Sequence, residues 1–194
     1  GDAVLATFPS VVLAVDTAAA IQAALADGNA DIANDERVQI RIGINLGDVI
    51  EDRGEVYGDG VNLAARLEGQ SKNYGVGIVI GEDTKVIVSE EFAILELDLI
   101  AVKGKAEAVR IHTVLGRKDL LQQPDFIALK DQHATMLAAY RKQDWTTAQD
   151  LIKDCRAADG TLGDLYDLYD ERVDFYLENP PDPDWDGVFI ATSK

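Results

Sequence analysis

The apolar positions of the first 116 residues follow two different periods. Where apolar and polar residues alternate, or β-branched residues run together, the pattern is typical of strands. Where apolar residues recur at three- and four-residue spacing, it is typical of helices packed on a sheet. This interleaving predicts an α+β domain. The predicted strands are 3–8, 38–50, 75–80, 95–102 and 109–115, the last two as an antiparallel pair, and the predicted helices include 11–25 and 82–89.

After residue 116 only the helical spacing remains, so we place a boundary at 116–121 and expect two domains, 1–116 and 117–194. The segment 139–148 resembles the turn between the helices of a tetratricopeptide-like hairpin. One repeat and a part cannot form a stable array. We therefore expect this extension to dock on the first domain or on a partner, such as a regulatory domain or protein. Its predicted helices are 125–142, 145–159 and 162–177.

A proline-rich tail follows the last predicted helix. Pro180, Pro181 and Pro183 stiffen an extended chain. Apolar residues beyond them, including Trp185 and Phe189, are expected to pack back on the helices as a hydrophobic clasp without chemistry of its own.

The composition narrows the classes of partner. The chain carries 35 acidic and 18 basic residues, a net charge of −17, which repels nucleic acid and anionic membranes. An anionic substrate would need local cations or metal ions. Cys155 is the only cysteine, which fits a reducing cytoplasm. No apolar run approaches the roughly 20 residues that span a bilayer, so we expect a cytoplasmic protein or the cytoplasmic part of a membrane-anchored one.

Candidate chemistry concentrates in residues 55–68, the sequence EVYGDGVNLAARLE, which we call the signature segment. It predicts a glycine-rich turn that leads directly into a helix. Gly58 and Gly60 allow a positive φ or a close approach to a neighbour. Asp59 is predicted to cap the N–H groups of the first helical turn.

Asn62 and Arg66 are four residues apart, so both project from one face of the predicted helix. Leu63 and Leu67 repeat this spacing and predict a buried stripe beside the polar pair. An amide and a guanidinium near a glycine turn suit a sugar hydroxyl and a phosphate. Taken alone, such a pair is more often two solvated residues of an ordinary amphipathic helix.

The signature segment as a whole resembles that of class III adenylate and guanylate cyclases, in the form common among bacterial members. There, a helix with Asn-x-x-x-Arg follows a Tyr-Gly-Asp-Gly turn. The resemblance covers residues 1–116 and implies a ferredoxin-like cyclase homology domain that lacks its first strand and two helices. We therefore interpret the chain as a fragment of a longer protein and expect it to be inactive in isolation.

The resemblance also assigns metal and phosphate ligands. Asp2, in the opening Gly-Asp-Ala-Val-Leu-Ala, matches the aspartate that binds one of two Mg²⁺ (or Mn²⁺) ions per active site; carboxylate oxygens suit magnesium. Lys103 or Lys105, in Val-Lys-Gly-Lys, matches the lysine that holds the terminal phosphates. Arg41 and Asp48 lie in the stretch that resembles the strand before the central helix, and we interpret them as structural.

The base preference depends on Glu55, seven residues before Asn62. Adenylate cyclases of the family tend to carry an aspartate there, and guanylate cyclases a small residue or cysteine. A carboxylate accepts a hydrogen bond from the amino group of adenine. Glu55 therefore favours ATP, although its side chain is one methylene longer than the family's.

The resemblance implies conversion of ATP to cyclic AMP and pyrophosphate, with the ribose oriented by Asn62 and the charge on the α-phosphate stabilised by Arg66. It also implies a head-to-tail homodimer, in which Asp2 of one chain serves the signature helix of the other. Three alternatives stay open. They are a guanylate cyclase, a cyclase-like domain that only dimerises or binds nucleotide, and a scaffold whose helical extension is the functional part.

Overall fold

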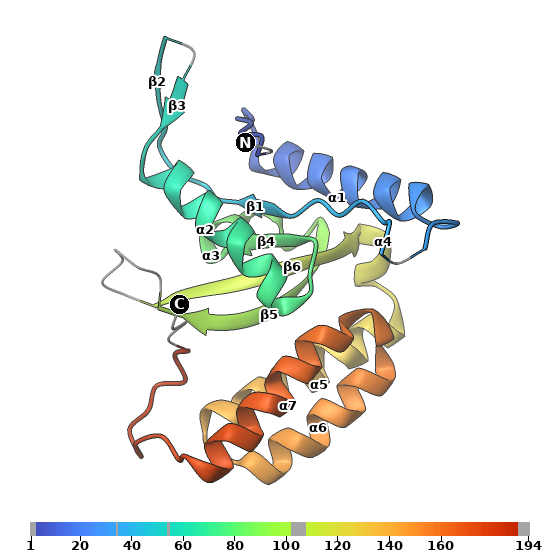
Figure 1. The fold of residues 1–194 in the computed structure, drawn as a ribbon, viewed down its shortest axis with the longest axis vertical. Helices are drawn as coiled ribbons and strands as arrows, with labels where there is room; N and C mark the ends of the chain where they lie inside the picture. Colours follow the sequence, from blue (N-terminus) through green and yellow to red (C-terminus); the bar gives the residue numbers. More distant parts are fainter. Residues whose placement is uncertain (1–2, 34, 54, 102–107, 190–194) are drawn as a thin grey trace.

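The structure, a computed structural model, describes residues 3–33, 35–53, 55–101 and 108–189. Its centre is a four-stranded sheet in the order β1-β4-β6-β5 (Figure 1). The parallel pair is β1 with β4, and β6 pairs antiparallel with both β4 and β5. The strands are β1 (Ile42–Ile44), β4 (Ile78–Gly81), β5 (Phe92–Ile100) and β6 (Val109–Arg117).

Helices cover both faces of this sheet. Alternate residues of β4 point to opposite faces: Ile78 and Ile80 pack with α1 and α3, and Val79 belongs to the apolar cluster that includes α2 and the C-terminal helices. The predicted α+β class with a helical extension is confirmed. The helices are α1 (Val11–Gly28), α2 (Asp59–Tyr74), α3 (Glu82–Val88), α4 (Lys118–Leu121), α5 (Pro124–Arg141), α6 (Trp145–Ala158) and α7 (Gly163–Glu178), with a 3₁₀ turn η1 at Gly160–Leu162.

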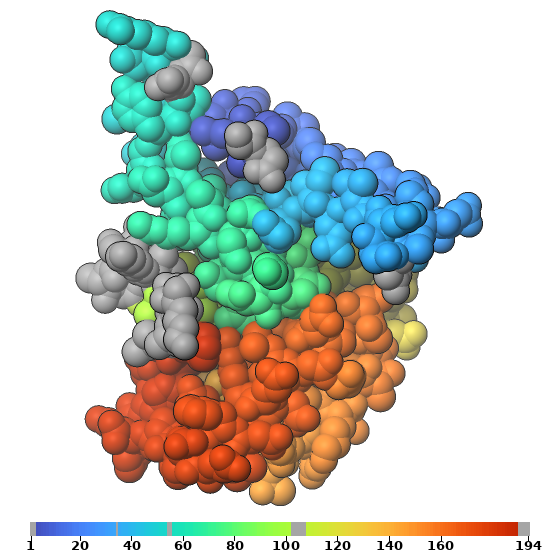
Figure 2. Space-filling view, in the orientation of Figure 1, coloured from blue at the N-terminus to red at the C-terminus, as the bar shows by residue number. Residues whose placement is uncertain are grey.

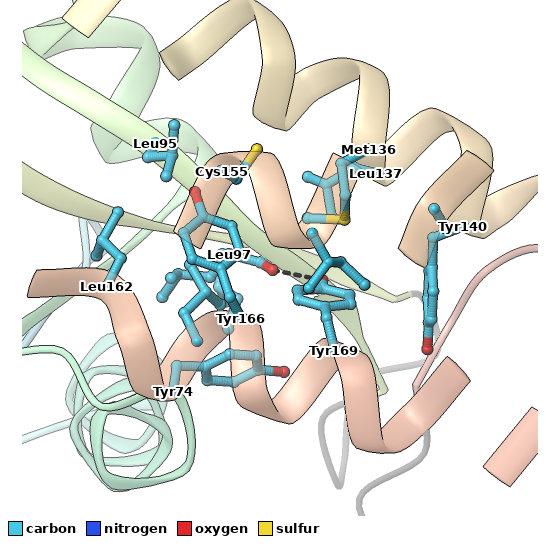
Figure 3. Close-up of a cluster of buried hydrophobic side chains, with 14 of the residues drawn as sticks. Tyr74, Leu95, Leu97, Met136, Leu137, Tyr140, Cys155, Leu162, Tyr166 and Tyr169 are labelled. Carbon is cyan, nitrogen blue, oxygen red and sulfur yellow. Dashed lines mark hydrogen bonds between the residues drawn. The ribbon is translucent and has the colours of Figure 1, made fainter. Parts of the chain in front are cut away.

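The C-terminal helices share one apolar core with α2 and the sheet (Figure 3). Tyr74 of α2, Leu97 of β5 and Tyr169 of α7 are each no more than 1% exposed. The Tyr169 hydroxyl also donates a 2.6 Å hydrogen bond to the Leu97 carbonyl. The extension therefore docks on the sheet, one of the two arrangements expected. The boundary at 116–121 and the tetratricopeptide-like character stay predictions.

The tail packs back as predicted. Trp185 lies among the rings of Tyr140, Trp145 and Tyr176, with centroid distances of 5.2–6.2 Å. Further on, the backbone of Phe189 pairs with the edge of β5 in a parallel bridge to Ile100. Its N–H donates to the Leu99 carbonyl at 3.0 Å, and its own carbonyl accepts from the Ala101 N–H at 3.2 Å.

Two predicted strands differ in the structure. Residues 3–8 form no strand, and among the described residues none pairs with their backbone. The strand predicted over 38–50 is regular only at 42–44, with a second short strand at 50–52. Part of the reason lies at α1: Asn29, the residue after this helix, bonds both the N–H and the carbonyl of Val38, and Gln22 of α1 donates to the Ile40 carbonyl. These side chains take backbone groups that a longer strand would use.

Helix α1 is long and apolar enough to cross a membrane by length and composition, with a mean hydropathy of 1.4 over 18 residues. This corrects the expectation that no apolar run approaches that length. The core helix of a soluble protein and a signal sequence pass the same test; here 11% of the window is buried, and α1 contacts the sheet through buried Val15 and Ala18.

His133 predicts a pH-dependent stability. It is 1% exposed, and its Nε2–H donates a 2.7 Å hydrogen bond to the Glu96 carbonyl. Burial lowers the pKa of His133 from 6.5 to about 4. The unfolded chain therefore binds more protons between these values, so the free energy of unfolding is highest above pH 6.5 and decreases as the pH falls toward 4. We expect His133 to lower the free energy of unfolding by about 2 kcal/mol when the pH falls from 7 to 5.

Urea denaturation of the natural protein and of His133→Gln at both pH values measures this effect. The glutamine keeps an N–H donor and gains no proton in this range. Burial also lowers the pKa of His112 to about 4, and its contribution is common to both proteins. Equal losses of stability in the two proteins would show that His133 is not the cause.

Candidate active site

The signature segment folds as a hairpin strand that leads directly into α2. Strands β2 (Ile50–Asp52) and β3 (Glu55–Tyr57) pair antiparallel. The turn between them includes Arg53, which has a positive φ of 54°. The hairpin projects from the body of the molecule next to the start of α2 (Figures 1 and 2).

Two glycines allow the close approach of the chain at the start of α2. Gly58 has a φ of 141°, which side-chain-bearing residues rarely adopt. A Cβ on Gly60 would lie 3.2 Å from the Asp48 carbonyl oxygen and 3.3 Å from the Cα of Gly47. The predicted cap at Asp59 is wrong, because Gly58 occupies the N-cap position and has no side chain to accept a bond. Asp59 is instead the first helical residue, where its negative charge interacts favourably with the helix dipole.

The two faces of α2 are as predicted. Asn62 and Arg66 are both exposed, while Leu67 is fully buried and Leu63 packs against the same core. The polar pair therefore projects from one exposed face in the half of α2 that is nearer the hairpin. An exposed guanidinium beside an amide can bind a phosphate and a hydroxyl of one ligand.

The inner face of α2 lies directly on β1 at Gly43. A Cβ at this position would collide with the backbone of Ala64 and of Glu68. Beside this contact, the Arg41 Nε donates a 2.7 Å hydrogen bond to Glu68, which supports the structural role predicted for Arg41. Sequence reasoning missed Gly43, although an isolated glycine in an alternating strand is a known sign of close backbone approach.

The family described as adenylate and guanylate cyclase catalytic domain matches residues 5–116, more than half of the chain. This chain belongs to that family. The signature resemblance is thereby confirmed at the level of the class III cyclase family.

Two relatives extend the comparison. A protein named "Putative adenylate cyclase 3" from Rhizobium meliloti (strain 1021) is 44% identical over 59 residues. That match spans 30% of this chain and 10% of the relative's length. The crystal structure titled adenylate/guanylate cyclase/hydrolase from Silicibacter pomeroyi is 30% identical, with a TM-score of 0.49, and the match covers 55% of this chain and 63% of that one.

The structure describes three of the predicted site residues of the cyclase domain. Glu55 lies in β3, which is separated from α2 by the single residue Gly58, and Asn62 and Arg66 lie in the first half of α2. Asp2, Lys103 and Lys105 lie outside the described residues, so their places in the site stay predictions.

Class III cyclase domains generally use divalent metals. Among the residues that the structure describes, no group of three or more His, Cys, Asp or Glu side chains could hold a metal ion. Because Asp2 is not among them, the described residues do not by themselves form the predicted metal site.

An open groove of about 480 Å³ lies away from the polar face of α2. It is bounded by α1, the segment 38–41, the C-terminal end of α2 and Asp164 of α7. Neither Asn62 nor Arg66 lines it, so this groove is not the predicted nucleotide site.

The contact at Gly43 gives a direct test of what positions α2. We expect Gly43→Ala to lower the free energy of unfolding by about 3 kcal/mol, because the methyl group must push α2 away from β1. The matched control is Gly69→Ala in α2, where a Cβ would meet nothing within 4 Å. The free energy of unfolding of the control should rise by up to about 1 kcal/mol, because alanine has a higher helix propensity than glycine. Urea denaturation measures both, and equal effects would contradict the steric constraint.

Proposed function

We propose that this protein is an adenylate cyclase that converts ATP to 3′,5′-cyclic AMP and pyrophosphate in intracellular signalling. The observation that carries the proposal is the exposed polar face of α2. There Asn62 and Arg66 project together, next to the strand that carries Glu55. Membership of the cyclase family and the adenylate cyclase name of the Rhizobium relative support it.

In the proposed reaction the ribose 3′-oxygen attacks the α-phosphorus of the same ATP molecule. The 3′-hydroxyl loses its proton to solvent water, a new P–O bond closes the ring, and the bond from the α-phosphorus to the bridging oxygen breaks, so that pyrophosphate leaves with that oxygen. Arg66 stabilises the negative charge that develops on the α-phosphate. Asn62 orients the ribose through hydrogen bonds, which keeps the attacking oxygen near the phosphorus.

The remaining roles follow from the resemblance. Glu55 accepts a hydrogen bond from the adenine amino group, and Lys103 or Lys105 binds the β- and γ-phosphates. Asp2 would hold one of two Mg²⁺ or Mn²⁺ ions, and the chemistry that these ions would supply is a lower pKa of the 3′-hydroxyl. We propose a cytoplasmic homodimer with its active sites at the subunit interface.

Arg66 provides the direct test in the full-length protein. We expect Arg66→Ala to lower the kcat for cyclic AMP formation about 10²-fold or more, because one transition-state donor is lost. Arg66 is exposed, so the thermal midpoint should not change. Lys72→Ala is the matched control, since it removes an exposed cation from the last turn of the same helix and should keep the natural kcat.

The assay compares ATP and GTP with Mg²⁺ and with Mn²⁺. Cyclic AMP formed by the natural protein and not by Arg66→Ala would support the proposed adenylate cyclase activity. Cyclic GMP as the main product would instead favour the guanylate cyclase. A folded dimer that binds ATP but forms neither product would contradict the enzyme and leave a nucleotide-binding module.

A further inference from the structure

One buried guanidinium links the helical extension to two elements of the cyclase domain. Arg172 of α7 donates from Nη1 to Asp98 Oδ2 of β5 at 2.6 Å. The Tyr74 hydroxyl of α2 donates to the same carboxylate oxygen at 2.7 Å, and Arg172 Nη2 lies 3.4 Å from that hydroxyl. The side chains of Arg172 and Asp98 are only 8% and 1% exposed.

Aromatic rings enclose this three-residue network. The Arg172 Cζ lies 3.5 Å from the centroid of the Phe189 ring, and 5.4 Å and 5.6 Å from those of Tyr169 and Tyr74. Such faces attract a guanidinium. Although burial opposes the charged form, the carboxylate of Asp98 raises the pKa of Arg172. Burial and Asp98 raise the pKa of Tyr74, so its hydroxyl keeps the proton that it donates.

The energetics indicate what the network contributes. Burying a charged pair costs several kcal/mol per ion. A protein in which apolar residues of similar volume replace such a pair is often as stable or more stable. Its directional hydrogen bonds, in contrast, specify one relative orientation of the elements that they join. The network therefore adds geometric definition more than stability.

One of the elements that the network joins carries the candidate site. Tyr74 is the last residue of α2, the helix that carries Asn62 and Arg66. Twelve residues along a helix span about 18 Å, so a change in the direction of α2 at Tyr74 also displaces Asn62. Misplacing a reacting group by about 1 Å can cost 10²-fold in rate.

We propose that Arg172 is a positioning residue of the cyclase, through which the helical extension fixes the direction of α2 relative to β5. The hydroxyl of Tyr74 and the carboxylate of Asp98 carry this effect. The effect on turnover rests on the proposed adenylate cyclase function. The effect on α2 itself does not.

Two variants of the full-length protein test the proposal. Tyr74→Phe keeps the ring and the Asp98–Arg172 pair and removes only the bond to α2. The double variant Asp98→Leu with Arg172→Met replaces the charged pair by apolar side chains of similar length. The matched control is Asp167→Leu with Arg156→Met, which changes the same residue types in an exposed pair between α6 and α7.

We expect the buried double variant to lower kcat about tenfold, and Tyr74→Phe about threefold. The KM for ATP should change less than twofold in both, and the thermal midpoint of the double variant should stay within a few degrees of the natural one. The control should keep the natural kcat. A purely structural role predicts instead that kcat follows the thermal midpoint.

Hydrogen exchange of the α2 amides, residues 59–74, gives a readout that needs no catalysis. We expect exchange in the first two turns of α2 to be at least threefold faster in both variants and unchanged in the control. Unchanged exchange together with unchanged kcat would overturn the proposal. If the double variant does not fold, Tyr74→Phe decides by the same criteria. If the natural protein makes no cyclic nucleotide, the proposed function fails, and the exchange rates alone decide on the positioning role.

Discussion

The direct contact between α2 and β1 at Gly43 is the constraint on which the site depends. Because no Cβ fits between this residue and the backbone of Ala64 and Glu68, α2 lies closer to the sheet than side-chain packing allows. The buried Leu67 then fixes the rotation of the helix about its axis. Asn62 and Arg66 face away from the sheet as a consequence, in reach of a ligand.

A second attachment, at the far end of α2, is polar and not steric. There Tyr74 contacts Asp98 and Arg172 inside an apolar core. A helix held at one point can still tilt about it, whereas a helix held at two separated points has a defined direction. The cyclase domain provides the first attachment, and the helical extension completes the second. Figure 2 shows α2, in green, between the N-terminal part and the orange helices of the extension.

The sequence predicted those features that depend on local spacing. The helices α1, α3, α5, α6 and α7, the β5–β6 pair and the exposed face of the signature helix were all visible as periodic patterns. The failures over residues 3–8 and 38–50 have a common cause, because each depends on what lies beside the segment in space. Residues 3–8 have the composition of a strand but no paired backbone among the described residues.

The candidate site shows the same division. The polar pair of α2 follows from a four-residue spacing, so the sequence was sufficient to predict it. The contacts that hold α2 are not local: Asp98 and Arg172 are 74 residues apart, and Gly43 lies 21 residues before Ala64. No periodic pattern connects such residues, and the charges of Asp98 and Arg172 predict exposure on average. Their burial became evident only from the packed structure.

The pairing of Phe189 with β5 has a consequence for the solubility of the molecule. β5 is the last strand of the sheet, and an open edge strand of nine residues can pair with another chain and start aggregation. The tail occupies the backbone groups of Leu99 and Ala101 at this edge. Without Phe189 these groups would face solvent, and this part of the strand edge would be open to pairing with another chain.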